Sequence, residues 1–491
     1  MHNATTGDKI ASAKAEDITF TASGDTATKT MTFTVPAKDV ANVKTVVYET
    51  LYIIEKGVPR IATSEKNAKE RAQTVSFLAP KLETSAKSGT TGKQQADALS
   101  TKETVIDTVK YSSLQTGKSY TVKGTLMLKA SDTDTKGTAI ATAEKTFTPA
   151  TADGSIDLTF TYDATKYVGK TVVAFEELQQ GGVTIATHKD LTDTAQSVYI
   201  PSIGTKAAGT DTGIDHQVAE NGKTITDTVS YTNLLPETTY KLAGTLVNKA
   251  TGKAALTADA SFTTGKAASG ASTVSGTADV VFKITDADSM AGTTFVAYET
   301  LSLGGKDIAE HKDLTDAGQT VYMPKVETQV KSDTTSVQTQ FAEKDVKITD
   351  TVNVSGLKNG QTYVIKGTLM DKATGKAVAG VTANPTEVKF TASAATSTQK
   401  IQYTFDGTDL EGHVLVVFED LYAVDSTGKE TLVGKEEDLQ SKTQAMLLTM
   451  HGPTLYTGGT GTRYIYIAGI GLAAVAVILV VLLRKKRKSA N

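Results

Sequence analysis

Residues 155–162 read SIDLTFTY, and every second residue of this stretch is apolar. In an extended strand, side chains two positions apart lie on one face, so the apolar residues from Ile156 to Tyr162 share a face. This alternation predicts a strand that is buried on one face and solvated on the other. Similar runs recur along the chain between turn sequences such as KATGK at Lys249. We therefore expect an all-β protein made of tandem β-sandwich domains.

Length and composition narrow the function classes. A chain of 491 residues is too long for one core, so several domains are expected. It has no Cys, so neither disulfides nor thiolate chemistry are available to it. The formal charge of −3 is small, and the only basic cluster lies at the C-terminus. A nucleic-acid partner is therefore not expected. We expect neither a metal nor a cofactor.

The chain repeats itself with a period of about 120 residues. Strands such as TITDTVSY, TYKLAGTL and FVAYETL recur in the same order, and a segment containing a Gln follows them. Three complete β-sandwich units are expected at 80–200, 201–323 and 324–452. Residues 1–79 hold the second half of such a unit, and residues 453–491 form a different, C-terminal region.

Four polar side chains of each unit fall on the apolar faces of the predicted strands. Asp227 in TITDTVSY and Glu299 in FVAYETL share their faces with apolar residues. Gln319 in GQTVYMP and Thr205 in SIGTKAA do the same. The equivalent residues are Asp107, Glu176, Gln196 and Thr84 in the preceding unit, and Asp350, Glu419, Gln444 and Thr328 in the following one.

Two of the six histidines stand at one fixed distance from the glutamine. HKDLTDTAQSVYIP begins at His188 and HKDLTDAGQTVYMP at His311, and the Gln follows eight residues later in both. A neutral imidazole beside a Thr hydroxyl can take its proton. A buried carboxyl without a partner stays protonated, and such donors stabilise the charge that develops on a Gln carbonyl oxygen.

Together these groups predict an acyl-transfer site. The Thr hydroxyl attacks the Gln side chain, ammonia leaves and an ester remains, in a reaction that each site performs once within the chain. Fixed neighbours supply roughly 7–11 kcal/mol of such a barrier. The competing interpretation is that each residue is a hydrogen-bonded polar group of the core, which a repeat copies as faithfully as a reactive one.

The combination of these motifs resembles a known family. The DTV, G-T-L and V-A-F-E strands, with the ending H-x-D-x-x-D-x-x-Q, resemble Gram-positive surface proteins built of VaFE repeats. The Ig-like or Cna-like domains of that family carry Thr–Gln ester bonds between the first and last strands, assisted by a His and two acids. The resemblance implies two sites here: Thr84 to Gln196 with Asp107, Glu176 and His188, and Thr205 to Gln319 with Asp227, Glu299 and His311.

The other two units depart from this pattern. The third complete unit keeps its Thr, its Gln and its two acids, but Glu436 stands at the His position and a Ser replaces the second Asp. For Thr328 and Gln444 the alternatives are that no bond forms or that the Glu436 carboxyl acts as the base. The half unit has Glu49 and Gln73 but no strand to supply a Thr, so it is not expected to close.

The C-terminal region predicts a surface anchor. Residues 464–483 are twenty uncharged, mostly apolar residues followed by RKKRK, which predicts one transmembrane helix with its tail inside the cell and the N-terminus outside. TLYTGGTGT ahead of it resembles a cell-wall sorting signal, although Leu455 stands where that signal has Pro. The resemblance implies cleavage by a sortase between Thr457 and Gly458 and attachment to peptidoglycan, or a membrane anchor if cleavage fails.

These features favour an extracellular stalk of an adhesin that does not act as an enzyme on other molecules. Because the N-terminal residues contain no apolar signal peptide, we interpret the sequence as a fragment or as having a wrongly assigned start. Three alternatives remain. The domains bind a host matrix or surface ligand directly, the chain is a sortase-assembled pilin subunit, or the Thr, His and acid set forms a hydrolase with an open cleft.

Overall fold

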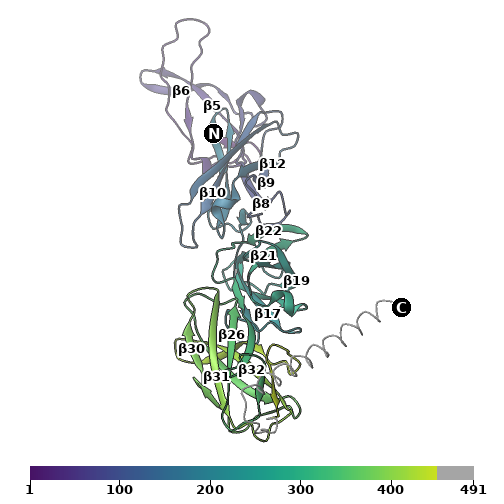
Figure 1. Ribbon diagram of the computed structural model, residues 1–491. Coiled ribbons are helices and arrows are strands. Elements are labelled where there is room, and N and C mark those ends of the chain that lie inside the picture. Colours follow the sequence, from purple (N-terminus) through teal and green to yellow (C-terminus); the bar gives the residue numbers. More distant parts are fainter. Residues whose placement is uncertain (451–491) are drawn as a thin grey trace, which may run out of the picture. The chain divides into compact units, whose positions relative to one another are not determined.

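The computed structural model describes residues 1–450, and these are nearly all β, as expected (Figure 1). They form two compact units, one of Met1–Tyr322 and one that begins at Met323. The described helices are short: α1 (Ala287–Met290) and the 3-10 helices η1 (Ala37–Asp39), η2 (Arg71–Gln73) and η3 (Ala164–Tyr167).

The 80–200 repeat is a sandwich of two sheets. Its strands are β8 (Lys81–Ser88), β9 (Glu103–Ser112), β10 (Tyr120–Lys129), β11 (Thr138–Phe147), β12 (Gly154–Tyr162), β13 (Thr171–Gln180), β14 (Val183–His188) and β15 (Ser197–Tyr199). One sheet has the order β12-β9-β8 and the other β11-β10-β13-β14, with β15 also on β13. The SIDLTFTY stretch forms β12, and its Phe160 packs with Val109 and Leu126 in one core between the sheets.

The 201–323 repeat has the same plan. Its strands are β16 (Ser202–Gly209), β17 (Thr224–Leu234), β18 (Thr239–Asn248), β19 (Ala254–Thr263), β20 (Val274–Lys283), β21 (Thr293–Leu303), β22 (Lys306–His311) and β23 (Thr320–Met323). The sheet orders are β16-β17-β20 and β19-β18-β21-β22, with β23 also on β21. The two repeats therefore have equivalent strands in equivalent places.

The second compact unit is a larger version of this sandwich. Its strands are β24 (Lys325–Ser332), β25 (Thr339–Phe341), β26 (Val346–Ser355), β27 (Thr362–Asp371), β28 (Lys376–Ala377), β29 (Thr382–Asn384), β30 (Val388–Thr391), β31 (Thr396–Phe405), β32 (Val414–Val424), β33 (Glu430–Glu436) and β34 (Ala445–Thr449). One sheet has the order β24-β26-β31-β29, and the other contains β25-β34-β32-β27-β28 with β30 and β33 at its sides.

Residues 1–79 form small sheets only. The strands are β1 (His2–Asn3), β2 (Lys14–Ala15), β3 (Phe33–Thr34), β4 (Lys44–Val46), β5 (Glu49–Glu55), β6 (Val58–Glu65) and β7 (Thr74–Ser76). They pair as β1-β4-β7, β2-β3 and β5-β6. Figure 1 labels the β5–β6 hairpin. Its residues are exposed over most of its length, in contrast to the buried strands of the complete repeats.

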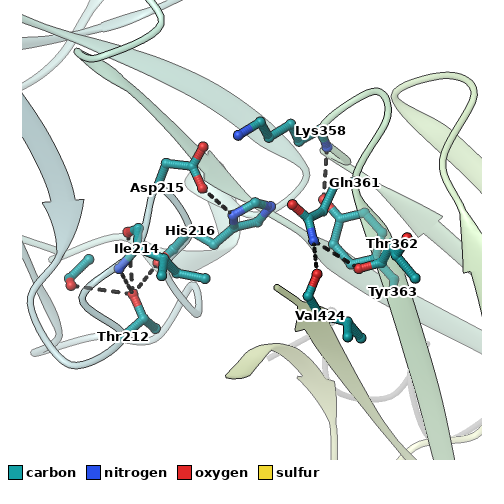
Figure 2. Close-up of polar contacts among 10 residues, drawn as sticks. Thr212, Ile214, Asp215, His216, Lys358, Gln361, Thr362, Tyr363 and Val424 are labelled. Carbon is teal, nitrogen blue, oxygen red and sulfur yellow. Dashed lines mark hydrogen bonds and ion pairs between the residues drawn. The ribbon is translucent and has the colours of Figure 1, made fainter. Parts of the chain in front are cut away.

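A buried tyrosine recurs at the start of the third long strand of each complete repeat. The Tyr363 hydroxyl accepts a hydrogen bond from the Lys358 N–H at 2.9 Å (Figure 2). The equivalent bonds run from Gln115 to Tyr120 at 3.0 Å and from Leu235 to Tyr240 at 2.9 Å. The turn before this strand is therefore held in the same way in all three repeats.

The predicted transmembrane helix at 464–483 and the predicted cleavage point between Thr457 and Gly458 lie outside the described residues. Within residues 1–450, no helix has the length and apolar character needed to cross a bilayer.

Candidate cross-link site

The sandwich topology brings the first strand of each repeat against its last segment. In the 80–200 repeat, the Ala86 N–H donates to the Ala195 carbonyl at 2.8 Å, and the Ala174 N–H donates to the Gln196 carbonyl at 3.1 Å. The Gln therefore lies between β8 of one sheet and β13 of the other. The equivalent bonds are Ala207 to Gly318 (3.0 Å), Ala297 to Gln319 (2.9 Å), Val330 to Thr443 (3.0 Å) and Val417 to Gln444 (3.2 Å).

Strand register places the two acids of the 80–200 repeat. Asp107 on β9 pairs with Ala86 on β8, while Glu176 on β13 lies opposite Gly124 on β10. On its other side, Glu176 pairs with His188 on β14. Both acids are fully buried, as the alternation of their strands predicts.

Burial raises the pKa of both carboxyl groups. For Glu176, desolvation followed by the negative charge of Asp107 raises the pKa to about 10, and desolvation raises the pKa of Asp107 to about 6. If Asp107 and Glu176 were both ionised, neither could donate a hydrogen bond to the other. A proton on Glu176 allows it to donate to the Asp107 carboxylate. Glu176 is therefore a neutral acid at neutral pH.

The same acid pair occurs in the other two complete repeats. Desolvation and then Asp227 raise the pKa of Glu299 to about 9, and desolvation and then Asp350 raise the pKa of Glu419 well above its ordinary value. The pKa values of both aspartates are also raised, chiefly by burial. Each repeat thus carries one protonated acid in its core.

The imidazole of the first site lies between the Thr hydroxyl and a second acid. His188 Nδ1 lies 3.4 Å from Thr84 Oγ1, and His188 Nε2 lies 3.1 Å from Asp193 Oδ2. A proton held on Nε2 by Asp193 leaves the Nδ1 lone pair directed at the hydroxyl. Gln196 Nε2 donates to Glu176 Oε2 at 2.7 Å, which holds the amide against the acid pair.

In the second site the two groups predicted to join are in direct contact. Gln319 Nε2 lies 2.8 Å from Thr205 Oγ1 and also donates to the His311 carbonyl at 3.4 Å. His311 Nε2 lies 3.2 Å from Asp316 Oδ2, which repeats the histidine–aspartate contact of the first site. The structure therefore brings together Thr, Gln, His and both acids in each of the two repeats.

The third site has the same architecture without an imidazole. Glu436 lies opposite Glu419 on β32, in the register that His188 has in the first repeat. Gln444 Nε2 donates to Glu419 Oε2 at 3.5 Å and to the Glu436 carbonyl at 3.3 Å. The Tyr403 hydroxyl donates to the other Glu419 oxygen at 3.4 Å, from a position that is Phe in the first two repeats.

The N-terminal half unit keeps one contact of the site. Gln73 Nε2 donates to Glu49 Oε2 at 2.8 Å, and Glu65 lies opposite Glu49 on the β5–β6 ladder. The Glu49 carboxyl is exposed, however, whereas the equivalent acids of the complete repeats are buried. The half unit therefore keeps the amide–acid contact without the burial of the complete repeats.

The glycine of the G-T-L strand has a role in the site that the motif alone did not indicate. A Cβ on Gly244 would lie 2.7 Å from both Glu299 Oε1 and Phe282 Cζ, closer than side-chain atoms approach. Glycine thus leaves room for the buried acid and for an aromatic ring beside it. Its recurrence within G-T-L in all three complete units was the available signal. The equivalent pairs are Gly124 with Phe160 and Gly367 with Tyr403.

This fold and site define a class of protein: tandem β-sandwiches with a Thr and a Gln held together beside a buried acid pair. A family model described as "T-Q ester bond containing domain" matches residues 1–77, 80–200, 201–323 and 324–447. The chain therefore belongs to the family of T-Q ester bond containing domains. The resemblance predicted from the sequence is confirmed.

Solved structures give more distant likenesses. A Mobiluncus mulieris bacterial adhesin with intramolecular disulfide, isopeptide and ester bond cross-links is 15% identical, with 50% of this chain and 97% of that chain covered and a TM-score of 0.23. The C-terminal domain of the Streptococcus agalactiae AgI/II polypeptide BspA is 8% identical, with 48% and 100% covered and a TM-score of 0.22. No curated protein matches the chain.

Proposed function

We propose that the chain is the stalk of a surface adhesin, and that its 80–200 and 201–323 repeats lock themselves with Thr–Gln ester bonds. The observation that carries this proposal is the 2.8 Å contact between Thr205 Oγ1 and the Gln319 amide beside a buried acid pair. Such proximity supplies a large part of the barrier for a reaction between two otherwise unreactive groups. Membership of the family points to the same bond.

The reaction balances without any added reagent. The Thr205 hydroxyl loses its proton to the His311 imidazole as its oxygen attacks the Gln319 side-chain carbonyl carbon. The tetrahedral intermediate places negative charge on the former carbonyl oxygen, which protonated Glu299 stabilises. The imidazolium then gives the proton to the departing nitrogen, so that one ester forms and one ammonia is released.

The resting amide in the first site has its nitrogen towards the acid. Gln196 Nε2 contacts Glu176 Oε2, whereas the reaction needs the amide oxygen there. A half-turn of the amide about its terminal torsion exchanges the two atoms, and the protonated acid then donates to the oxygen. Because the two ends of an amide have nearly the same shape, the cavity accommodates both orientations.

Burial supports a site that acts on itself rather than on other molecules. Gln196 is fully buried and Thr84 is 7% exposed, so an external ester or amide has no access to the hydroxyl. The same burial excludes the water that would hydrolyse the ester. A hydrolase would need an open cleft at this place.

A cross-linked stalk needs an anchor, and we assign that role to the C-terminal region. Cleavage by a sortase between Thr457 and Gly458 would join the chain to peptidoglycan, and the apolar segment at 464–483 would hold it in the membrane until then. This puts the repeats outside the cell. There the absence of Cys leaves the esters as the covalent reinforcement of the sandwiches.

The intact mass of the purified chain tests the cross-link. We expect it to be lighter than the encoded mass by one ammonia for each closed site, with the 80–200 ester found in a peptide that joins Thr84 to Gln196. In Thr84→Ala the mass deficit relative to the encoded mass should be smaller by one ammonia, and the second site should stay closed. A folded protein of unmodified mass would overturn the proposal.

A further inference from the structure

The Gln95 side chain is fully buried, although it lies at the end of its sandwich. Its Nε2 donates to the Tyr199 carbonyl of its own repeat at 2.9 Å and to the Asn233 carbonyl of the 201–323 repeat at 3.2 Å. Its Oε1 accepts from the Leu235 N–H at 3.1 Å and from the Tyr240 hydroxyl at 2.8 Å. All four hydrogen-bonding positions of this amide are therefore filled, three of them by the next repeat.

A second amide makes the reverse connection. Asn233 has a φ of 62°, a left-handed conformation that Asn tolerates better than most residues. Its Nδ2 donates to the Lys170 carbonyl at 2.9 Å and to the Ile200 carbonyl at 3.1 Å, both in the 80–200 repeat. Gln95 thus enters one repeat and Asn233 reaches back into the other.

A third connection lies away from these amides. The Ala98 N–H donates to the Ile308 carbonyl at 2.8 Å, and Ile308 is fully buried. Contacts at separate places on the junction resist rotation of one repeat against the other, which a single flexible linker would allow. Bending at this junction would remove three of the four partners of the buried Gln95 amide, which opposes the motion.

The position of Gln95 is occupied differently in the following repeat. Gln95 forms a parallel bridge with Tyr199, and His216 forms the equivalent bridge with Tyr322. His216 Nδ1 lies 2.8 Å from Asp215 Oδ1 (Figure 2). An amide therefore fills this bridge position in the 80–200 repeat, and an imidazole fills it in the 201–323 repeat.

We propose that Gln95 and Asn233 lock the 80–200 and 201–323 repeats into one rigid segment. The partner of this end surface is the next repeat of the same chain, recognised by the backbone groups of residues 233–235 at the end of β17 and by the Tyr240 hydroxyl. The rigidity follows from these contacts alone. Its use, to hold the far end of a stalk in a fixed direction, rests on the function proposed above.

The lack of Cys makes the junction easy to probe with spin labels. Lys123→Cys and Thr257→Cys, both at exposed strand positions, place one nitroxide on each repeat of the full chain. Double electron–electron resonance should give one narrow distance distribution in this labelled parent. We expect the distribution to broaden in Gln95→Ala and in Asn233→Gly. Glycine is chosen at position 233 because it adopts the left-handed backbone conformation of Asn233 without strain.

Gln94→Ala is the matched control, because the Gln94 amide donates within its own repeat, to the Ser197 carbonyl at 2.8 Å. It should leave the distribution narrow. Peptide mass on the same samples reports ester closure, so failure of the junction is distinguished from failure of the cross-link. Where either variant loses its folded spectrum, Tyr240→Phe, which removes one donor to Gln95, replaces it. A broad distribution in the parent, or a narrow one in the folded junction variants, would overturn the proposal.

Discussion

Glu436 pairs with Glu419 across the β32–β33 ladder, in the same register that pairs His188 with Glu176 in the first repeat. A carboxylate therefore occupies the place of the imidazole. The cross-linking Thr keeps its place, since Thr328 pairs with Val352 as Thr84 pairs with Val109.

The first prediction concerns the rate of closure at the third site. We expect an ester between Thr328 and Gln444 to form more slowly than the other two, because a carboxylate is a weaker base than an imidazole. Introducing Glu436→His with Ser441→Asp should accelerate closure by about 10²- to 10⁴-fold. Peptide masses followed over time after refolding measure the rate. Glu437→His, at an exposed neighbour, should change nothing.

The second prediction concerns the acid behind the imidazole. Asp193→Asn should slow closure of the first site, because Asn no longer holds the proton on His188 Nε2. The second site, which uses Asp316, should close at its usual rate in the same molecule. Asp190→Asn is the control, since the Asp190 carboxylate bonds to Thr192 within the loop. Equal rates in both variants would refute a positioning role for Asp193.

The third prediction concerns the pH dependence of stability that the buried acids Glu176 and Glu299 cause. In the unlinked Thr84→Val/Thr205→Val chain, Glu176 and Glu299 have folded pKa values of about 10 and about 9, above their ordinary value of 4.5. At these two acids the folded state then binds more protons than the unfolded state, so the stability that they contribute is fully present below about pH 4.5 and is lost as the pH rises to 9 to 10.

Thermal melting of this unlinked chain between about pH 5 and pH 9 measures that dependence. Adding Glu176→Gln and Glu299→Gln should flatten the slope, because a neutral amide does not titrate. Melting temperatures that increase with pH across the range would show that the two acids are already ionised in the folded state.

The fourth prediction concerns Gly244, which lies against the buried Glu299 carboxyl of the second site. Gly244→Ala should prevent closure of the second site and destabilise its repeat by about 1–3 kcal/mol, because the methyl group collides with Glu299 and Phe282. Denaturant unfolding and peptide mass report the two effects. Gly265→Ala is the control, since Gly265 has open space around its Cβ position. An ester of normal yield in Gly244→Ala would mean that the site has more room than the contacts indicate.

The fifth prediction concerns the contribution of one bond. Thr84→Val keeps the shape of the side chain but cannot form the ester, so it removes a covalent loop of more than 100 residues. By analogy with a disulfide, the 80–200 repeat should lose up to about 4–5 kcal/mol of unfolding free energy. Chemical unfolding of parent and variant gives the difference. Ser85→Ala, a change of the neighbouring exposed residue, should have little effect.

Much of the fold and the acid pair could be predicted from alternation. Strand periodicity places Asp227 and Glu299 on inward faces, and the structure buries both completely. Periodicity could not place the histidines, because His188 and His311 lie at strand ends with about a quarter of each side chain exposed. Their position opposite the acids depends on the register of a hairpin.

Contacts between distant parts of the chain escaped sequence analysis. The Tyr403 hydroxyl reaches Glu419 because β31 and β27 pack face to face over Gly367, which no single strand pattern reveals. Gln95 was overlooked for the same reason, since three of its partners belong to another repeat. A polar residue in a loop gains such a role only from the surface that packs against it.

The short stretch between neighbouring sites has a consequence for resistance to proteases. With both esters closed, a single cut anywhere from 85 to 195 leaves the two ends of that repeat covalently attached. Between the repeats, only residues 197–204 depend on one backbone strand for continuity. That stretch is buried or half-buried throughout, so the one place between these two repeats where a single cleavage would separate them is also shielded from digestion.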